Sequence, residues 1–260
     1  MKELIYRVPN FRGKQRFLIT LDKCFGPFRL KASQGVKIRG YLSSSQDASL
    51  CSTKGDCPLL IDEIERLPPN GVFVDCGANC GFYSALAAKR LRAGGKVISI
   101  EPSFREYERL HWATRNNDHE CVWAALSAGA GENGHIAHID SAVGHTGMNR
   151  IKSANVGNSE SCPIMTLDFI FDNYLDSNAV IDLLKIDVEG YEMFALRGMR
   201  VALEQGRVKR AVVEVTDKFL TLNGSSKAEL YEFMRGYGYS PSRNQDCWQY
   251  DEVFVAPAKT

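Results

Sequence analysis

Short apolar runs and amphipathic stretches alternate along most of this chain. The apolar runs are rich in β-favouring residues and predict core strands at 72–76, 96–100, 121–126, 180–186 and 210–215. The stretches between them have helical periodicity, at 82–92, 104–116, 166–175 and 190–204. Strands that alternate with helices predict an α/β fold, in which a mostly parallel sheet is covered by helices on both faces.

The C-terminal part of the chain adds one more helix and two more strands. Ser226 and Glu229 form the pattern of a capping box, which predicts a helix that continues to about Arg235. Residues 237–239 and 252–256 have the pattern of an antiparallel pair. We therefore expect seven strands in one Rossmann-like sheet.

The first 56 residues lack the alternation of strands and helices that is seen in the rest of the chain. Residues 17–20 and 35–39 favour short antiparallel strands, and the polar run 43–47 is typical of a loop. Pro58 suits the first turn of a helix, which would begin the main domain. We expect a small β-rich cap over residues 1–56 and a second unit over residues 57–260.

One long segment breaks the alternation. Residues 129–163 are rich in Gly, Ser, Asn and His, and only residues 134–139 alternate like a strand. A loop of this length in a compact domain is usually functional or disordered. Because it leaves the edge of the predicted sheet, we interpret it as a lid over the substrate.

The clearest chemical signal is the stretch VFVDCGANCGFYS, residues 72–84. A buried strand ends near Asp75, and Gly77 and Gly81 let the chain turn tightly before a helix begins. The dinucleotide fingerprint G-x-G-x-x-G is absent, because Asn79 stands at its second glycine position, and the Lys-Ser/Thr pair of a P-loop is absent too. The pattern suits a ligand with an amino-acid end and no pyrophosphate, and it predicts S-adenosylmethionine.

The binding roles follow from this ligand. Asp75 and Asn79 would meet its ammonium group, while the glycines would lie against its carboxylate and ribose. Ala78 and Phe82 complete the predicted binding turn. The alternative for Asp75 is a structural one, in which its carboxylate caps the following helix.

A second acid, Glu101, follows the next predicted strand and stands beside Pro102, 26 positions after Asp75. A carboxylate at the end of the second strand of a βαβ unit is placed to accept hydrogen bonds from ribose hydroxyls. The alternative is an ordinary strand-end acid that faces water. Because two glycines lie between the two acids, we favour the cofactor interpretation.

A second cluster, IDLLKIDVEGYE, begins at Ile181 and predicts a buried strand with charges at its end. Alternation would place Lys185, Asp187 and Glu189 on one side of the strand. Burying such charges unpaired is costly. They would serve the site, or Lys185 and an aspartate would form a structural ion pair while Glu189 caps the next helix, and the two roles could coexist. Ligands of open α/β sheets bind beyond the carboxyl ends of strands, which would point Asp187 and Glu189 at the methyl donor.

Charge and composition narrow the function classes. The 260 residues carry 32 Lys and Arg against 31 Asp and Glu, so no global field attracts the chain to nucleic acid or to an anionic membrane. The N-terminus lacks the apolar core of a signal peptide, and no run of about 18 apolar residues exists for a membrane span. We expect a soluble, cytoplasmic protein, with a homo-oligomer left open.

Several motifs, taken in order, resemble the FkbM family of S-adenosylmethionine-dependent methyltransferases. They are VDCGANCGFYS, the triplet IEP, Asn116-Asn117, MTLDFI, LLKIDVEGYEMFALRG and VVEV, over residues 72–215. The resemblance implies a class I methyltransferase fold and methyl transfer to a hydroxyl oxygen of a sugar, glycoconjugate or polyketide-type natural product. Cys76 and Cys80 depart from the family, which more often has small or aliphatic residues there, and the first 56 residues lie outside the match.

The chemistry of this transfer requires alignment of donor and acceptor, and a base for the hydroxyl proton. We expect Asp187 or Glu189 to be that base. The first alternative is a divalent metal ion held by Asp187, Glu189 and Glu214. The second is His145, which lies in the expected lid and titrates near neutrality.

Two other functions remain open at this point. A catalytically silent adenosyl-binding module that serves as a partner subunit would keep Asp75 and Glu101 but would not need the acids near the acceptor. A nucleic-acid methyltransferase would need a basic face and an Asn/Asp-Pro-Pro-Tyr/Phe pocket at the end of the fourth strand. The chain has KIDVEG there instead.

Overall fold

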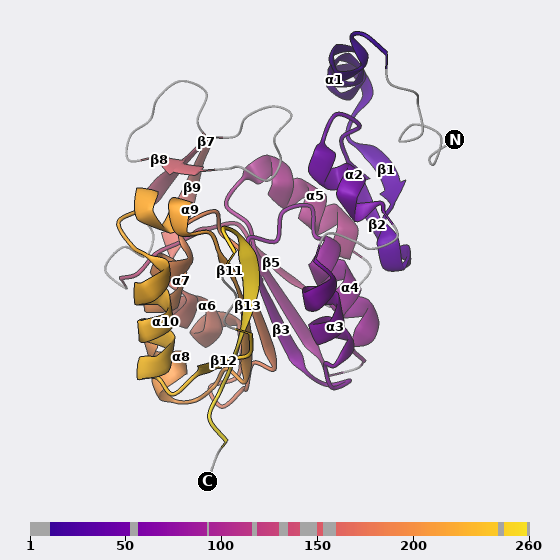
Figure 1. Cartoon of the computed structure of the whole chain (residues 1–260). Helices are drawn as coiled ribbons and strands as arrows, with labels where there is room; N and C mark the ends of the chain where they lie inside the picture. Colours follow the sequence, from indigo (N-terminus) through magenta and orange to yellow (C-terminus); the bar gives the residue numbers. More distant parts are fainter. Residues whose placement is uncertain are drawn as a thin grey trace.

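The computed structural model describes residues 11–52, 57–92, 94–115, 119–129, 135–140, 150–152, 160–243 and 247–258. At its centre is a seven-stranded sheet in the order β12-β13-β11-β10-β3-β4-β5 (Figure 1). The strands are β3 (Val72–Cys76), β4 (Lys96–Ile100), β5 (Glu120–Val122), β10 (Leu183–Ile186), β11 (Arg210–Val215), β12 (Ser240–Pro241) and β13 (Tyr250–Val255). Neighbouring strands are parallel, except that β13 is antiparallel to both β11 and β12. The expected seven-stranded, mostly parallel sheet is confirmed.

Helices cover both faces of this sheet. On one face lie α3 (Pro58–Glu65), α4 (Phe82–Arg90) and α5 (Phe104–Thr114); on the other lie α6 (Leu167–Tyr174), α7 (Glu192–Arg197), α8 (Arg200–Glu204), α9 (Asp217–Leu222) and α10 (Lys227–Gly236). Side-chain alternation along β3 explains the two layers. Phe73 joins the apolar cluster on the α3–α4 face, whereas Val72 and Val74 join the cluster on the α6–α10 face.

Most predicted element positions agree with the structure, and the exceptions have physical causes. The run 121–126 is divided into β5 and β6 (Ala125–Leu126). The helix expected over 190–204 is divided at Gly198, which approaches the Ser127 carbonyl so closely that a Cβ would stand 2.1 Å from that oxygen. At the C-terminal edge, residues 240–241 pair with β13 in place of residues 237–239.

The expected strand at residues 17–20 is wrong, because these residues lie in helix α1 (Lys14–Phe25). Within α1, the buried positions Leu18 and Asp22 are four residues apart, which is a helical spacing. The N-terminal hairpin instead consists of β1 (Phe28–Lys31) and β2 (Lys37–Gly40). The cap is therefore part helical.

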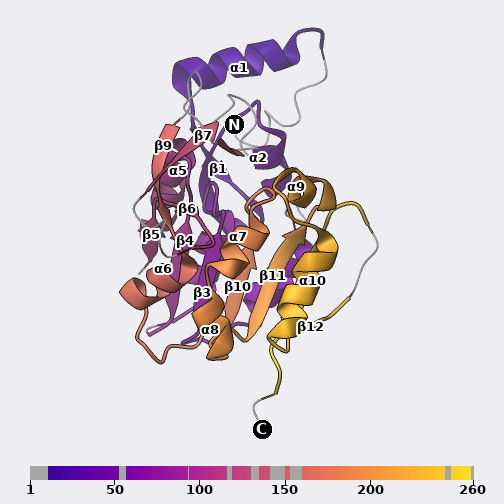
Figure 2. The same cartoon turned by 90° about the vertical axis from the view of Figure 1, so that its left-hand side faces the viewer.

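The loop expected at residues 43–47 is also wrong, since helix α2 (Ser45–Leu50) begins there. The side chain of Ser44 accepts a hydrogen bond from the Asp47 backbone N–H and caps the helix. Figure 2 shows α1 projecting above the body of the molecule, with α2 and the hairpin beneath it.

A buried arginine joins this N-terminal region to the sheet domain. Arg109 of α5 is almost fully buried and donates to the Asp47 carboxylate at 2.5 Å, to Glu106, and to the Arg39 carbonyl at 2.8 Å. Its pKa is raised by the two carboxylates, which outweigh the opposing effect of burial. Apolar residues of the hairpin, such as Ile38, pack in the same cluster as Phe73.

The segment 129–163 contains more regular structure than the sequence predicts. It forms β7 (Ile136–Asp140), β8 (Arg150–Lys152) and β9 (Glu160–Met165), which build a small sheet with β6 in the order β6-β9-β7-β8. Only β7 was expected as a strand. His145 and the pair Asn116-Asn117 lie outside the described residues.

No helix in the described part of the chain combines the length and apolar character needed to cross a membrane.

Candidate active site

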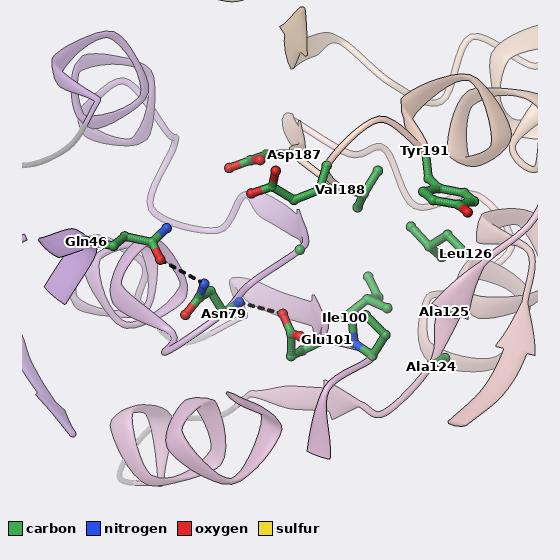
Figure 3. Close-up of a pocket in the computed structure, with 13 residues that line it drawn as sticks. Gln46, Asn79, Ile100, Glu101, Ala124, Ala125, Leu126, Asp187, Val188 and Tyr191 are labelled. Carbon is green, nitrogen blue, oxygen red and sulfur yellow. Dashed lines mark hydrogen bonds between the residues drawn. The ribbon is translucent and has the colours of Figure 1, made fainter. Parts of the chain in front are cut away.

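A pocket opens at the carboxyl ends of β3, β4 and β10 (Figure 3). Its walls combine turn residues, strand-end acids and apolar side chains. They are Gln46, Gly77, Asn79, Ile100, Glu101, Pro102, Ala124, Ala125, Leu126, Asp187, Val188, Glu189 and Tyr191. Figure 3 shows Asn79 and Glu101 on one side, Tyr191 and Leu126 on another, and Asp187 above Asn79 and Glu101 in this view. The pocket thus combines a polar end with an apolar one.

The turn after β3 needs its glycines for two different reasons. Gly77 has φ +76°, and a Cβ there would stand 1.9 Å from the Asp187 carbonyl oxygen, so the turns after β3 and β10 touch at this point. Gly81 has φ +79° and lets α4 pack against Leu110 of α5. Asn79 also has a positive φ, 49°, and its Oδ1 accepts the Cys80 backbone N–H. This turn therefore presents main chain to the pocket.

Glu101 lies at the centre of the pocket wall. Its two carboxylate oxygens accept backbone N–H groups of Asn79 at 2.8 Å and of Ser103 at 2.9 Å. Burial raises the pKa of Glu101 to about 8, against the lowering effect of these two hydrogen bonds. Each oxygen keeps a second lone pair, so the carboxylate can accept two more hydrogen bonds from a ligand.

A buried lysine connects the two strand-end aspartates. The Lys185 ammonium lies 3.3 Å from the Asp75 carboxylate and 3.4 Å from the Asp187 carboxylate, and it donates to the Gly77 carbonyl at 3.0 Å. Burial lowers the pKa of Lys185, but the two aspartates raise it by a larger amount. The pKa of Lys185 therefore lies above its ordinary value. The structural Lys–Asp ion pair is therefore present, and the same ammonium also contacts the aspartate that lines the pocket.

Asp75 does not line the pocket. Its side chain is fully buried, and its second oxygen accepts a hydrogen bond from the Ser84 hydroxyl at 2.6 Å. Ser84 contacts Ser99 at 2.6 Å, and Ser99 contacts Nε2 of His119 at 2.9 Å. Asp75 thus anchors a buried polar chain behind the turn, and its position gives no support to the expected contact with an ammonium group.

The other residues of the predicted turn form its rear side. Ala78 and Phe82 are buried, and neither lines the pocket. Cys76 and Cys80 are buried as well, and desolvation raises the pKa of both thiols far above the ordinary value. These four side chains hold the shape of the turn, while Gly77, Asn79, Glu101 and Pro102 reach the pocket.

The acids after β10 occupy different positions from those predicted by strand alternation. The strand ends at Ile186, so Glu189 lies beyond it with φ +55° and does not share a strand face with Lys185. Capping of the following turn, considered for Glu189, is performed by Glu192. Its carboxylate accepts the N–H groups of Val188 and Gly190 at 3.1 and 3.0 Å.

Glu214 is the third acid of the metal hypothesis. It accepts a hydrogen bond from Gln249 at 2.6 Å, and burial together with the nearby Asp187 raises its pKa to about 9. Among the described residues, no group of three His, Cys, Asp or Glu side chains is arranged to hold a metal ion.

Several pocket residues were not predicted from the sequence. Gln46 comes from the N-terminal cap, and its side-chain oxygen accepts a hydrogen bond from the Asn79 amide at 3.3 Å. Tyr191, Val188 and the segment 124–126 form the apolar end. The position of 124–126 after the third strand was an available signal, because parallel strands end at the same edge. No local pattern pointed to Gln46.

The fold and the position of the pocket are those expected of a class I, S-adenosylmethionine-dependent methyltransferase. The Methyltransferase FkbM domain matches residues 75–241. This match covers more than half of the chain, and the protein belongs to the FkbM methyltransferase family. The family resemblance seen in the sequence is confirmed.

Other comparisons are more distant. No curated protein matches the chain by sequence. A TehB-like S-adenosylmethionine-dependent methyltransferase from Corynebacterium glutamicum is 13% identical, with 76% of this chain and 87% of that one covered and a TM-score of 0.44. TrmK of M. capricolum, in complex with S-adenosyl-homocysteine, is 7% identical over 77% and 68% of the two chains, with a TM-score of 0.44. The O-methyltransferase TomG of Streptomyces achromogenes is 12% identical over 76% and 78%, with a TM-score of 0.43.

The pocket chemistry fits S-adenosylmethionine. Glu101 has lone pairs free for two ribose hydroxyls, and Ile100, Leu126 and Tyr191 give an apolar surface for a planar base. Asn79 and the Gly77 main chain lie at the polar end, where the amino-acid part of the cofactor would bind. Bound there, the cofactor supplies a methyl group on a positively charged sulfur.

Proposed function

We propose that this protein transfers the methyl group to a hydroxyl oxygen of a sugar, a glycoconjugate or a polyketide-type natural product. The observation that carries the proposal is the position of Asp187. Its carboxylate lines the pocket, is 36% exposed, and follows the strand whose terminal turn touches the glycine turn of the cofactor site. A carboxylate in this place can reach both an acceptor and solvent.

In the proposed reaction, Asp187 orients the acceptor hydroxyl and takes its proton as the new oxygen–carbon bond forms and the carbon–sulfur bond breaks. A positioned base of this kind contributes about 10²- to 10⁴-fold in rate. The ion pair with Lys185 fixes the direction of the carboxylate, and because Lys185 is held by Asp75 as well, that direction is set by the fold. Glu189, on the same rim, is the second candidate for this role.

We keep the direct base as the first candidate on geometric grounds. Of the proposed metal trio, Asp187 and Glu189 line the pocket, whereas Glu214 does not. Two carboxylates form an incomplete ligand set for a divalent ion unless substrate or water supplies the rest.

The test is methyl transfer from labelled S-adenosylmethionine. The purified protein is incubated with fractions of glycolipids, oligosaccharides and natural products, with and without a chelator, and the labelled product is identified. We expect label at a hydroxyl oxygen, unaffected by the chelator. Label in a nucleic-acid fraction, or cofactor binding with no transfer to any fraction, would overturn the proposal, and loss of transfer with chelator would change Asp187 from base to ligand.

A further inference from the structure

The charge of the chain is distributed unevenly, although its sum is close to zero. Residues 1–56 contain eleven Lys and Arg against four Asp and Glu. Between residues 11 and 40 there are eight cations and one acid, Asp22. Asp22 is buried, and its carboxylate accepts the backbone N–H groups of Leu42 and Ser43, both at 2.8 Å. The surface formed by this part of the cap is therefore positive.

Helix α1 and the segment just before it also expose large aromatic side chains. Phe11, which precedes the helix, and Phe17 and Phe25 within it are 50%, 54% and 72% exposed, and the rings of Phe11 and Phe17 lie 6.3 Å apart. Arg16 and Lys23 of the same helix are exposed as well. Both views of the molecule show α1 projecting beyond the body (Figures 1 and 2). Exposed apolar rings next to cations on a projecting helix are typical of an interaction surface.

We propose that the exposed surface of α1, together with Phe11 just before it, docks on a membrane surface that contains anionic phospholipid. The surface is defined by Phe11, Arg16, Phe17, Lys23 and Phe25. Phenylalanine rings gain free energy by entering the boundary between headgroups and acyl chains, and each nearby Lys or Arg is attracted by anionic headgroups. Together these two contributions give reversible peripheral binding.

Two other partners fit the surface less well. A second copy of this chain that used the same face would bring Arg16 and Lys23 against identical cations, which opposes an isologous dimer. A nucleic acid would satisfy the cations through its phosphates, and phenylalanine rings can stack on unpaired bases, but a duplex offers these rings no apolar phase to enter.

The docking surface is connected to the rim of the pocket. Gln15 of α1 donates to the Ser43 carbonyl at 2.9 Å, and Asp22 accepts from the Ser43 N–H. Three residues later in the chain, Gln46 lines the pocket. A docked α1 would therefore bring the pocket toward the membrane, where a lipid-linked hydroxyl compound could serve as acceptor. This last step rests on the proposed function, whereas the membrane binding does not.

The experiment is vesicle sedimentation with the full chain. The vesicles contain phosphatidylcholine alone or an equal mixture of phosphatidylcholine and phosphatidylserine. We expect binding to the mixed vesicles, weakened by added salt because exposed charges are screened. The variant Arg16→Gln/Phe17→Ser/Lys23→Gln should reduce the partition coefficient by about tenfold or more, since it removes two cations and one ring.

A matched variant at the opposite end of the molecule is the control. Arg200→Gln/Val201→Ser/Arg235→Gln removes the same number of cations and one exposed apolar side chain from α8 and α10, which lie far from α1 in both views. It should bind vesicles as the unchanged protein does. Both variants should keep their affinity for S-adenosylmethionine, measured by calorimetry, which shows that the pocket is intact whether or not methyl transfer is observed.

Three results would overturn the inference. The first is equal binding of the protein to neutral and mixed vesicles, or to neither. The second is unchanged binding by the α1 variant. The third is α1-dependent binding to a single-stranded oligonucleotide without binding to vesicles, which would assign the surface to nucleic acid.

Discussion

Asp75 and Asp187 lie at the carboxyl ends of adjacent parallel strands, contact the same lysine, and have opposite surroundings. Asp75 is a residue of β3 itself, has no exposed surface and accepts a hydrogen bond from Ser84, whereas Asp187 follows β10 and is 36% exposed at the pocket. Both lie within 3.4 Å of the Lys185 ammonium. The difference assigns anchoring to the first aspartate and leaves the second available for chemistry.

The comparison teaches that one buried cation can serve structure and function together. Lys185 compensates the charge of Asp75 inside the fold and holds the direction of Asp187 outside it. Its hydrogen bond to the Gly77 carbonyl also fixes the distance between the two turns. The cofactor turn and the candidate base are thus positioned by the same side chain.

The largest effect should come from Lys185→Met. This change leaves the buried Asp75 carboxylate without its cation, and breaking a buried pair in this way costs about 3–5 kcal/mol of unfolding free energy. Urea denaturation measures it. The double variant Lys185→Met/Asp75→Asn should recover part of the loss, because the unpaired charge is gone; a single variant as stable as the original would contradict the anchoring role.

Asp187→Asn tests the second aspartate, for which we expect an effect on turnover and little effect on cofactor binding. We expect turnover to fall by roughly 10²-fold or more, the contribution of a positioned base, with cofactor affinity nearly unchanged. Single-turnover methyl transfer measures the rate, and calorimetry measures the affinity. Glu189→Gln is the parallel test. Near-normal turnover in both variants would exclude these acids and leave His145 as the next candidate.

Glu101→Ala tests the cofactor side of the pocket by itself. Loss of charge-assisted hydrogen bonds to ribose should weaken S-adenosylmethionine binding by about 1.5–3 kcal/mol. Titration calorimetry on the folded variant gives the value. S-adenosylmethionine should raise the melting temperature of the unchanged protein, whereas NAD should leave it unchanged. Equal affinity in the variant would remove Glu101 from the ribose site.

A pH dependence of cofactor affinity is also expected. In the free protein the pKa of Glu101 is raised to about 8, so the group is mostly protonated at pH 7. Accepting two backbone N–H groups and two hydroxyls requires the ionised form, so binding should release a proton below pH 8. Affinity should rise from pH 6 to 8, by at most about tenfold per unit, and level off above.

Calorimetry in buffers with different ionisation enthalpies counts the released proton. The stability effect of Glu101 has the opposite direction. Its folded-state pKa lies above the unfolded value, so its stabilising contribution is complete below about pH 4.5 and is lost as pH rises through 8. Glu101→Gln should reduce the pH dependence of cofactor affinity and the pH dependence of stability. An affinity that does not change with pH in the unchanged protein would contradict the assignment of Glu101 to the ribose site.

The core of the fold could be predicted because its local signals agree with its tertiary structure. The strands 72–76, 96–100 and 210–215 are apolar runs that end at turn residues, and their observed bounds are the predicted ones. Residues 17–20 failed because Phe-Leu-Ile-Thr favours a strand locally, while Asp22 ties the same segment to Leu42 as a helix. That contact spans 20 residues and leaves no local pattern.

The site could be predicted only as far as backbone geometry determines it. Gly77 and Glu101 were recognisable, because a tight turn and a strand-end acid have fixed places in a βαβ unit. The inward direction of the Asp75 side chain could not be predicted, because it depends on the Ser84 hydroxyl of α4, which donates to its carboxylate. Gln46 was also missed, because its approach to Asn79 results from packing of the cap onto α5.

The buried contact between Asp47 and Arg109 also has a consequence for the order in which the chain folds. The two residues are 62 positions apart, and during synthesis the N-terminal region leaves the ribosome well before α5 does. Until Arg109 arrives, Asp47 has no buried cation, and the hairpin has no sheet domain to pack against. This part of the cap is therefore made before the side chain that completes its buried contact, and it adds one wall to a pocket whose other walls come from later sequence.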